Sequence, residues 1–213
     1  NQQGTLENTS LATGGRNAET IESAKRYAPL FYRSQDRLVT LEDFKGHANR
    51  FASNFGSTGK AAVIVRRAFS SANIIDLFVL EKASDTQLRR ATQEYKKQLL
   101  ESIEPKKMLT DEIVIVDGLI RTLDLFLIIT LDDNFRLGQN SIIQSARDLT
   151  QQYFNVDNSD FGESFIPQDL IRFILSNETN IRFARVDNVE SPIKVGFNEI
   201  VQLNNLNISV EFV

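Results

Sequence analysis

The stretch from Ala18 to Phe55 reads AETIESAKRYAPLFYRSQDRLVTLEDFKGHANRFASNF, and the rest of the chain is organised around it. A short helical segment ends at Pro29, because proline biases the residue before it away from helical geometry. After a polar connector, apolar side chains recur at intervals of three and four over residues 41–51, which predicts a second helix. Thr40 and Asp43 form a capping-box pattern at its start. The apolar stripe of this second helix is expected to face a sheet.

Downstream of this stretch, strand-like and helix-like patterns alternate. Runs rich in Val, Ile and Phe with a short connection favour an antiparallel hairpin. Residues 119–131 are the clearest strand, because apolar side chains at alternate positions share one face. Ser84 and Ser141 are expected to cap long helices. We expect helices at residues 17–28, 41–51, 84–104, 141–153 and 167–175, and strands at residues 61–69, 73–81, 113–116, 119–131, 181–186, 199–203 and 206–213.

This order predicts an α+β fold, with antiparallel sheets and helices packed on one face, in two layered subdomains. Residues 1–17 are rich in Asn, Gln, Thr, Ser and Gly, so we expect a linker or extended arm from a missing upstream domain. Residues 18–135 are expected to hold a helical docking element and an α+β subdomain. Residues 136–213 are expected to hold a second α+β subdomain that ends in a C-terminal β-hairpin.

The composition excludes several classes of function. The net charge of -4 argues against binding nucleic acid through bulk charge. The chain has no cysteine, which excludes disulfides, zinc–thiolate sites and thiol catalysis, and favours a cytoplasmic origin. The longest apolar run, residues 125–129, is far shorter than the roughly 20 residues that span a bilayer. We therefore expect neither a nucleic-acid nor a membrane partner.

No residues have the arrangement of an active site. His47 is the only histidine and has no partners at the spacing of a triad or metal site, so a structural role is expected. Residues 132–134 (Asp-Asp-Asn) lack the spacing of a calcium loop and predict a turn. Gly14-Gly15 lacks a preceding strand and fits the end of a linker better than a phosphate site. We predict no catalytic, cofactor-binding or metal-binding residue, no cofactor and no enzymatic activity.

The order of short motifs indicates a function instead. A glycine pair precedes an acidic helix start, an alanine–proline pair, a polar residue with an arginine, and then V-T-x-x-D followed by an aromatic residue. A hairpin, a long helix ending at Pro105, and N-E-I-V-x-L followed by N-I-S-V come later. The residues concerned are Gly14-Gly15, Glu19–Glu22, Arg26, Ala28-Pro29, Gln35–Arg37, Leu38–Phe44, Phe69–Leu80, Asn198–Leu203 and Asn207–Val210. In this order, over residues 12–213, they resemble the baseplate wedge proteins of contractile-tail phages, the baseplate J-like family that is also found in contractile injection systems.

The resemblance implies a structural subunit of the virion, made in the host bacterial cytoplasm. Family members form the inner baseplate ring around the tail hub, pair with their own copies as a dimer within the ring, bind other wedge and hub-side tail proteins, and rearrange on contraction. A soluble adaptor or peptide-binding domain stays open as an alternative. A hydrolase-like or transferase-like enzyme is a third possibility, although no nucleophile–base pair is in view. The suspected protein-interface residues are Pro29, Gln35, Arg37, Thr40, Asp43 and Phe44.

Overall fold

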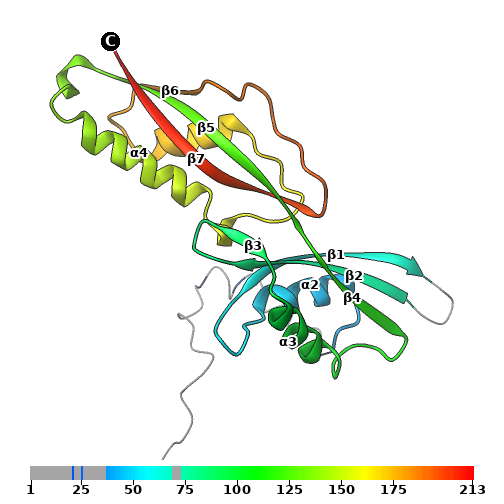
Figure 1. Cartoon of the computed structure of the whole chain (residues 1–213). Helices are drawn as coiled ribbons and strands as arrows, with labels where there is room; N and C mark the ends of the chain where they lie inside the picture. Colours follow the sequence, from blue (N-terminus) through cyan, green and yellow to red (C-terminus); the bar gives the residue numbers. More distant parts are fainter. Residues whose placement is uncertain (1–20, 22–24, 26–36, 69–72) are drawn as a thin grey trace, which may run out of the picture.

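A computed structural model describes residues 21, 25, 37–68 and 73–213. The predicted arm at residues 1–17, the predicted helix at residues 17–28 apart from Ile21 and Lys25, and the predicted interface residues Pro29 and Gln35 lie outside the described residues. The elements in chain order are α2 (Leu41–Arg50), β1 (Gly59–Ala68), β2 (Asn73–Lys82), β3 (Leu88–Arg90), α3 (Gln93–Ile103), β4 (Asp111–Asp117), β5 (Leu119–Leu131), the 3-10 helix η1 (Asp133–Phe135), α4 (Gln139–Tyr153), the 3-10 helix η2 (Val156–Asn158), α5 (Pro167–Asn177), β6 (Phe183–Val186) and β7 (Glu199–Phe212). The fold is α+β, as predicted, with two sheets that each carry helices (Figure 1).

The first subdomain, residues 37–117, is built on β2. This strand pairs antiparallel with β1 and β3 and parallel with β4. Its alternate side chains Ile75, Leu77 and Val79 face α2 and α3, so that one face of the sheet is covered. Phe44 of α2 and Leu99 of α3 are completely buried in this core. The predicted hairpin of β1 and β2 is therefore confirmed, with helices on one face of its sheet.

The start of α2 follows the predicted capping box. The Asp43 amide donates to Thr40 Oγ1 (3.3 Å), and the Thr40 amide donates to Asp43 Oδ2 (2.9 Å). A cap of this kind stabilises a helix by about 1 kcal/mol, because it satisfies amides that have no partner in the first turn. The cap also fixes where the helix begins, which places Phe44 over the sheet.

The second subdomain, residues 119–213, is built on β5, which lies between β6 and β7 (Figure 1). Alternate side chains of β5, among them Leu125, Leu127 and Ile129, are buried against α4 and α5. The other row of β5 is more exposed, and Phe126 is 45% accessible. The alternation of residues 119–131 thus predicted both the bounds of the strand and its buried face.

Both sheets are mixed, which differs from the antiparallel sheets that the sequence predicted. β7 runs parallel to β5 along residues 199–212 as one strand, so the expected C-terminal hairpin is wrong. The register shifts by one between Leu203 and Asn205, where a turn was expected. An Asn-Asn pair is compatible with both a turn and a bulge, and here it forms a bulge within a continuous strand.

The long helix that was predicted from Ser84 begins later. α3 starts at Gln93, and Thr92 caps it by accepting a hydrogen bond from the Tyr95 amide (3.2 Å). The preceding residues form a turn and β3, which pairs with the end of β2. Likewise Ser141 does not cap α4, because its hydroxyl donates to the Gly138 carbonyl (2.9 Å) and the helix begins at Gln139.

Gly118 joins the two subdomains, since β4 ends at Asp117 and β5 begins at Leu119. The expected boundary at residue 135 therefore differs from the division of the sheets, because β5 belongs to the second sheet. A small apolar cluster connects the two, and it consists of Leu80, Leu88, Ile120, Val156, Phe161 and Ile200. Within the described residues, no helix is long and apolar enough to cross a membrane.

Candidate docking surfaces

The predicted interface residues around α2 differ in how far their side chains are exposed. Arg37 is exposed, while Thr40 and Asp43 are engaged with each other in the cap. Phe44 is 0% accessible and belongs to the core, so it is wrong as an interface residue: it has no surface left for a partner. His47 links α2 to α3: its Nε2 lies 2.9 Å from the Ser102 hydroxyl, which itself donates to the Leu99 carbonyl (2.7 Å). Of the four described candidates, Arg37 is the one with a side chain exposed and outside the cap and the core.

The longest strand, β7, has one side paired and one side at the edge of its sheet. At its start the Asn198 carbonyl accepts from the Leu119 amide (2.9 Å), and just beyond its end the Val213 amide donates to the Leu131 carbonyl (3.0 Å). Backbone groups of successive residues point to opposite sides of a strand. The bulge after Leu203 shifts the alternation by one. Even-numbered residues therefore face β5 before the bulge, and odd-numbered residues face it afterwards.

The remaining backbone groups of β7 point away from β5. Two contacts agree with this assignment: the Glu199 carbonyl accepts from the Gly162 amide (2.9 Å), and the Leu206 carbonyl accepts from the Arg147 guanidinium (3.3 Å). Beyond the bulge the outward-facing residues are Leu206, Ile208, Val210 and Phe212. For the last three of these, no described residue makes a hydrogen bond to the outward backbone groups.

The same residues have apolar side chains that α4 and α5 cover incompletely. Ile208, Val210 and Phe212 pack against the hydrophobic core of the second subdomain and stay half-buried. The Arg136 guanidinium carbon lies 5.0 Å from the centre of the Phe212 ring. We call residues 206–212, with their outward backbone groups, the β7 edge. It combines unpaired hydrogen-bonding groups with a partly open apolar row, which is the chemistry that an added strand uses.

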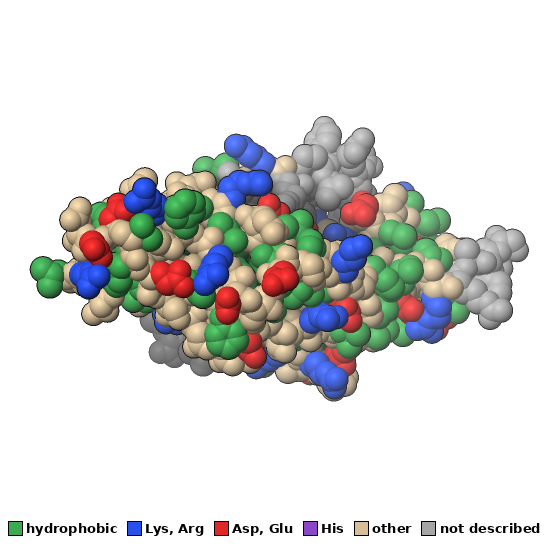
Figure 2. All heavy atoms as spheres, turned by 90° about the horizontal axis from the view of Figure 1, so that it is seen from above, with side chains coloured by type: hydrophobic (Ala, Val, Ile, Leu, Met, Phe, Trp, Pro, Cys, Tyr) green, Lys and Arg blue, Asp and Glu red, His purple; other side chains and the backbone are tan. Residues whose placement is uncertain are grey.

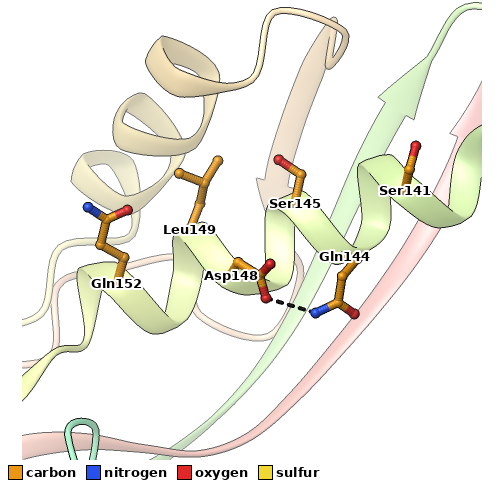
Figure 3. A pocket seen from close by; sticks show the side chains of 6 residues that line it. All are labelled: Ser141, Gln144, Ser145, Asp148, Leu149 and Gln152. Atoms are coloured by element: carbon orange, nitrogen blue, oxygen red, sulfur yellow. Dashed lines mark hydrogen bonds between the residues drawn. The ribbon is translucent and has the colours of Figure 1, made fainter.

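A polar strip runs along the outer face of α4. Five polar side chains and Leu149 line an open hollow of about 430 Å³ there. Figure 3 shows that all six lie on this one helix. Gln144 donates to Asp148 (2.8 Å), and Ser145 donates to Glu178 (2.6 Å). No second element lines this strip. It is an open surface on a single helix, without a second wall that could enclose a ligand.

Charged side chains cross the junction between the subdomains. Lys82 lies 3.1 Å from Asp85 and 3.2 Å from Asp157, and buried Lys60 lies 3.5 Å from Asp160. Burial by itself would lower the pKa of Lys82, but the two carboxylates outweigh it, so that the pKa is raised above its ordinary value. Because Lys60 and Lys82 belong to the first subdomain while Asp157 and Asp160 belong to the second, these pairs help fix the relative position of the two.

Glu81 is the centre of a buried hydrogen-bond network at the end of β2. Its carboxylate accepts from Arg89 (2.8 Å) and from the Thr92 amide (3.0 Å). Burial favours a higher pKa for Glu81, but these hydrogen bonds prevail, and the pKa lies below its ordinary value. Burial and the nearby Glu81 charge raise the pKa of Tyr95. This hydrogen-bond network joins β2, β3 and the start of α3, and its role is structural.

The second subdomain contains a pocket of about 220 Å³ with aromatic walls. We call it the aromatic pocket and define it by Tyr153, Phe154, Asp160, Glu163, Phe165 and Phe173. The Tyr153 ring centre lies 5.3 Å from that of Phe154, 6.4 Å from that of Phe165 and 5.8 Å from that of Phe173. Ile200 and Val201 of β7 complete the wall, so the pocket adjoins the start of that strand.

Neither the β7 edge nor the aromatic pocket was predicted from the sequence. The alternation in residues 206–213 was visible, but alternation does not tell an edge strand from a central one. For the pocket a signal was present: its four aromatic residues lie between positions 153 and 173 of the sequence. Their convergence on one cavity depends on how α4, α5 and the loop between them pack, which local patterns do not reveal.

Comparison with known proteins adds no family assignment. No protein-family model and no curated protein matches the chain. Within residues 37–68 and 73–213, and at positions 21 and 25, no group of three or more acidic or histidine side chains is placed to hold a metal ion. The candidate sites are therefore surfaces and one small pocket, described by their own geometry.

Proposed function

We propose that the protein is a structural subunit of a contractile phage tail baseplate wedge, in the inner ring around the hub, and that it takes part in the rearrangement on contraction. The resemblance of residues 12–213 to baseplate wedge proteins supports this assignment. Its partners are then its own copies and other wedge and hub-side tail proteins, and its place is the virion.

The observation that carries the assembly role is the β7 edge. Its seven residues extend over about 23 Å, at about 3.3 Å per residue. Natural proteins protect edges of this length with charges, bulges or covering segments, because an open edge pairs with other chains. On β7 the bulge lies before the edge, and Arg147 covers one carbonyl of it. A partner strand would pair with the other backbone groups and cover the half-buried apolar row.

Surface charge agrees with specific contacts rather than bulk attraction. Figure 2 shows Lys and Arg side chains interspersed with Asp and Glu over the face in view, without a large field of one sign. The net charge of -4 is small for 213 residues. Recognition by such a surface depends on local shape and hydrogen bonds.

The test is a pull-down of the tagged chain from a lysate that is assembling contractile tails, with the recovered partners identified by mass. Recovery of wedge and hub-side tail proteins in a repeating stoichiometry supports the proposal. Recovery of the chain alone, or with a soluble metabolic protein, refutes it and favours the adaptor interpretation. Arg37→Ala is expected to weaken assembly more than folding, since its side chain is exposed.

A matched pair of proline variants tests the role of the β7 edge. Val210→Pro removes an outward amide, and proline is tolerated on edge strands, so folding should be kept while assembly is lost. Ser209→Pro removes an amide that faces β5, so it should lower the free energy of unfolding by about 3 kcal/mol. If the folded Val210→Pro chain recovers the same partners in the same amounts, β7 is not the assembly edge.

A further inference from the structure

We propose that the aromatic pocket binds the guanidinium group of an arginine side chain that a partner protein presents. This inference does not depend on the baseplate assignment or on the β7 edge. It follows from the charge, the aromatic walls and the size of the pocket.

The charge of the pocket is negative. Among the described residues that line it, Asp160 and Glu163 are the charged ones, and both are acidic. Asp160 is compensated by Lys60 at 3.5 Å. Glu163 accepts a hydrogen bond from the Asp160 amide (3.1 Å), but within the described chain no Lys or Arg nitrogen forms an ion pair with it. One carboxylate at the mouth of the pocket therefore lacks a cationic partner.

The tyrosine in the wall responds to the same negative field. Burial raises the pKa of Tyr153 first, and the charges of Asp169 and Glu163 raise it further. Asp169 already has a partner, since it lies 3.5 Å from Arg172. The field that opposes a phenolate at this position favours a cation next to the neutral ring.

The walls supply the complementary interaction. Tyr153 and Phe173 are half-buried, with ring centres 5.8 Å apart, while Phe154 and Phe165 are buried behind them. A cation over an aromatic face is attracted by the ring quadrupole, and arginine in particular stacks its planar group on such faces. Glu163 can then accept from the guanidinium N–H groups.

The size of the pocket points to a side chain as the occupant. Its volume of about 220 Å³ is below the range of roughly 300–1,000 Å³ that small-molecule and cofactor sites occupy. A guanidinium with its methylene stem is small enough for such a space. The partly exposed rim leaves room for the backbone that carries the side chain, so a protein partner is the source.

The experiment is a titration of the isotope-labelled full chain with N-acetyl-arginine-methylamide, followed by NMR of the aromatic side chains. The neutral isostere N-acetyl-citrulline-methylamide serves as the matched probe. We expect saturable shifts at Tyr153 and Phe173 with the arginine probe, and at least threefold weaker binding of the citrulline probe. Equal binding of both probes, or shifts that do not include Tyr153 and Phe173, overturns the proposal.

Two variants separate the charge from the ring. Glu163→Gln changes an exposed residue, so the fold should be kept. Its affinity for the arginine probe should fall three- to tenfold, and this loss should be smaller at high salt, which screens the charge. Phe173→Leu keeps an apolar wall but removes the ring, and a similar loss is expected. Glu112→Gln is the control, because it removes the same charge from an exposed position on β4 in the other subdomain. If Glu163→Gln binds the arginine probe as tightly as Glu112→Gln does, the proposal is refuted.

Discussion

Substitution of Gly118 by alanine tests how the two subdomains meet. A Cβ atom at this position would lie 2.6 Å from Cζ and 2.7 Å from Cε1 of Phe161, and 3.0 Å from Cγ of Leu80. Carbon atoms normally approach to about 3.5–4.0 Å. The Phe161 ring must therefore retreat by roughly 1 Å, within a cluster that Leu80, Val156 and Ile200 also fill.

The magnitude follows from two opposing effects. Overpacking of this kind lowers the free energy of unfolding by about 1–3 kcal/mol. Replacing glycine by alanine also lowers the conformational entropy of the unfolded chain, which raises the free energy of unfolding by about 0.4–1 kcal/mol. We therefore expect Gly118→Ala to reduce stability by about 1–2 kcal/mol in urea unfolding followed by far-UV circular dichroism.

A double-mutant cycle identifies the cause. Phe161→Leu removes the ring atoms that the new Cβ meets. In that background Gly118→Ala should lower the free energy of unfolding only slightly, which corresponds to a coupling free energy of about 1 kcal/mol between the two substitutions. Gly138→Ala is the control, since its nearest neighbour to a Cβ is 3.9 Å away. Strict additivity of Gly118→Ala and Phe161→Leu would refute this account of the junction.

Three further predictions concern single contacts. Glu81→Gln should lower stability at pH 7 by about 1–3 kcal/mol, because it removes a charged partner of Arg89. The pKa of Glu81 is lowered in the folded state, so its carboxylate stabilises the fold at a pH above its ordinary pKa, and this stabilisation is lost as the pH falls. The difference in unfolding free energy between Glu81→Gln and the parent chain, measured by urea unfolding, should therefore shrink below about pH 4. Thr40→Ala should lower the midpoint of urea unfolding by an amount equivalent to about 1 kcal/mol, and no change would contradict the capping role. Arg147→Ala uncovers the Leu206 carbonyl on the β7 edge, so sedimentation velocity should show more self-association, and an unchanged monomer would count against an open edge.

The sequence predicted those elements whose pattern is local. The capping box at Thr40 and Asp43 set the start of α2, and Pro167 marked the first residue of α5. The alternation in residues 119–131 set both bounds of β5. In each case the residues that decide the element lie within it, so that no distant contact is needed.

Predictions that depended on distant contacts were wrong or incomplete. Leu88 continues the helical spacing of Tyr95 and Leu99, but its amide donates to the Gln202 side chain (2.7 Å) and it lies in β3. The direction of β7 is set by pairing with β5 across about 80 residues. The candidate sites follow the same rule: Phe44 was proposed for an interface on a local motif, and the fold buries it.

The misplaced boundary between the subdomains has the same origin. β4 and β5 follow each other with one residue between them, which in sequence resembles a continuous strand region within one sheet. The Gly118 amide donates to the Val79 carbonyl of the first sheet (3.1 Å), while the next amide donates to the Asn198 carbonyl, beside the second sheet (2.9 Å). The chain thus changes sheets within a single residue. A glycine is needed there because Phe161, 43 positions later, fills the space that a Cβ would take. No local pattern at Gly118 contains that information, whereas the cycle with Phe161→Leu measures it directly.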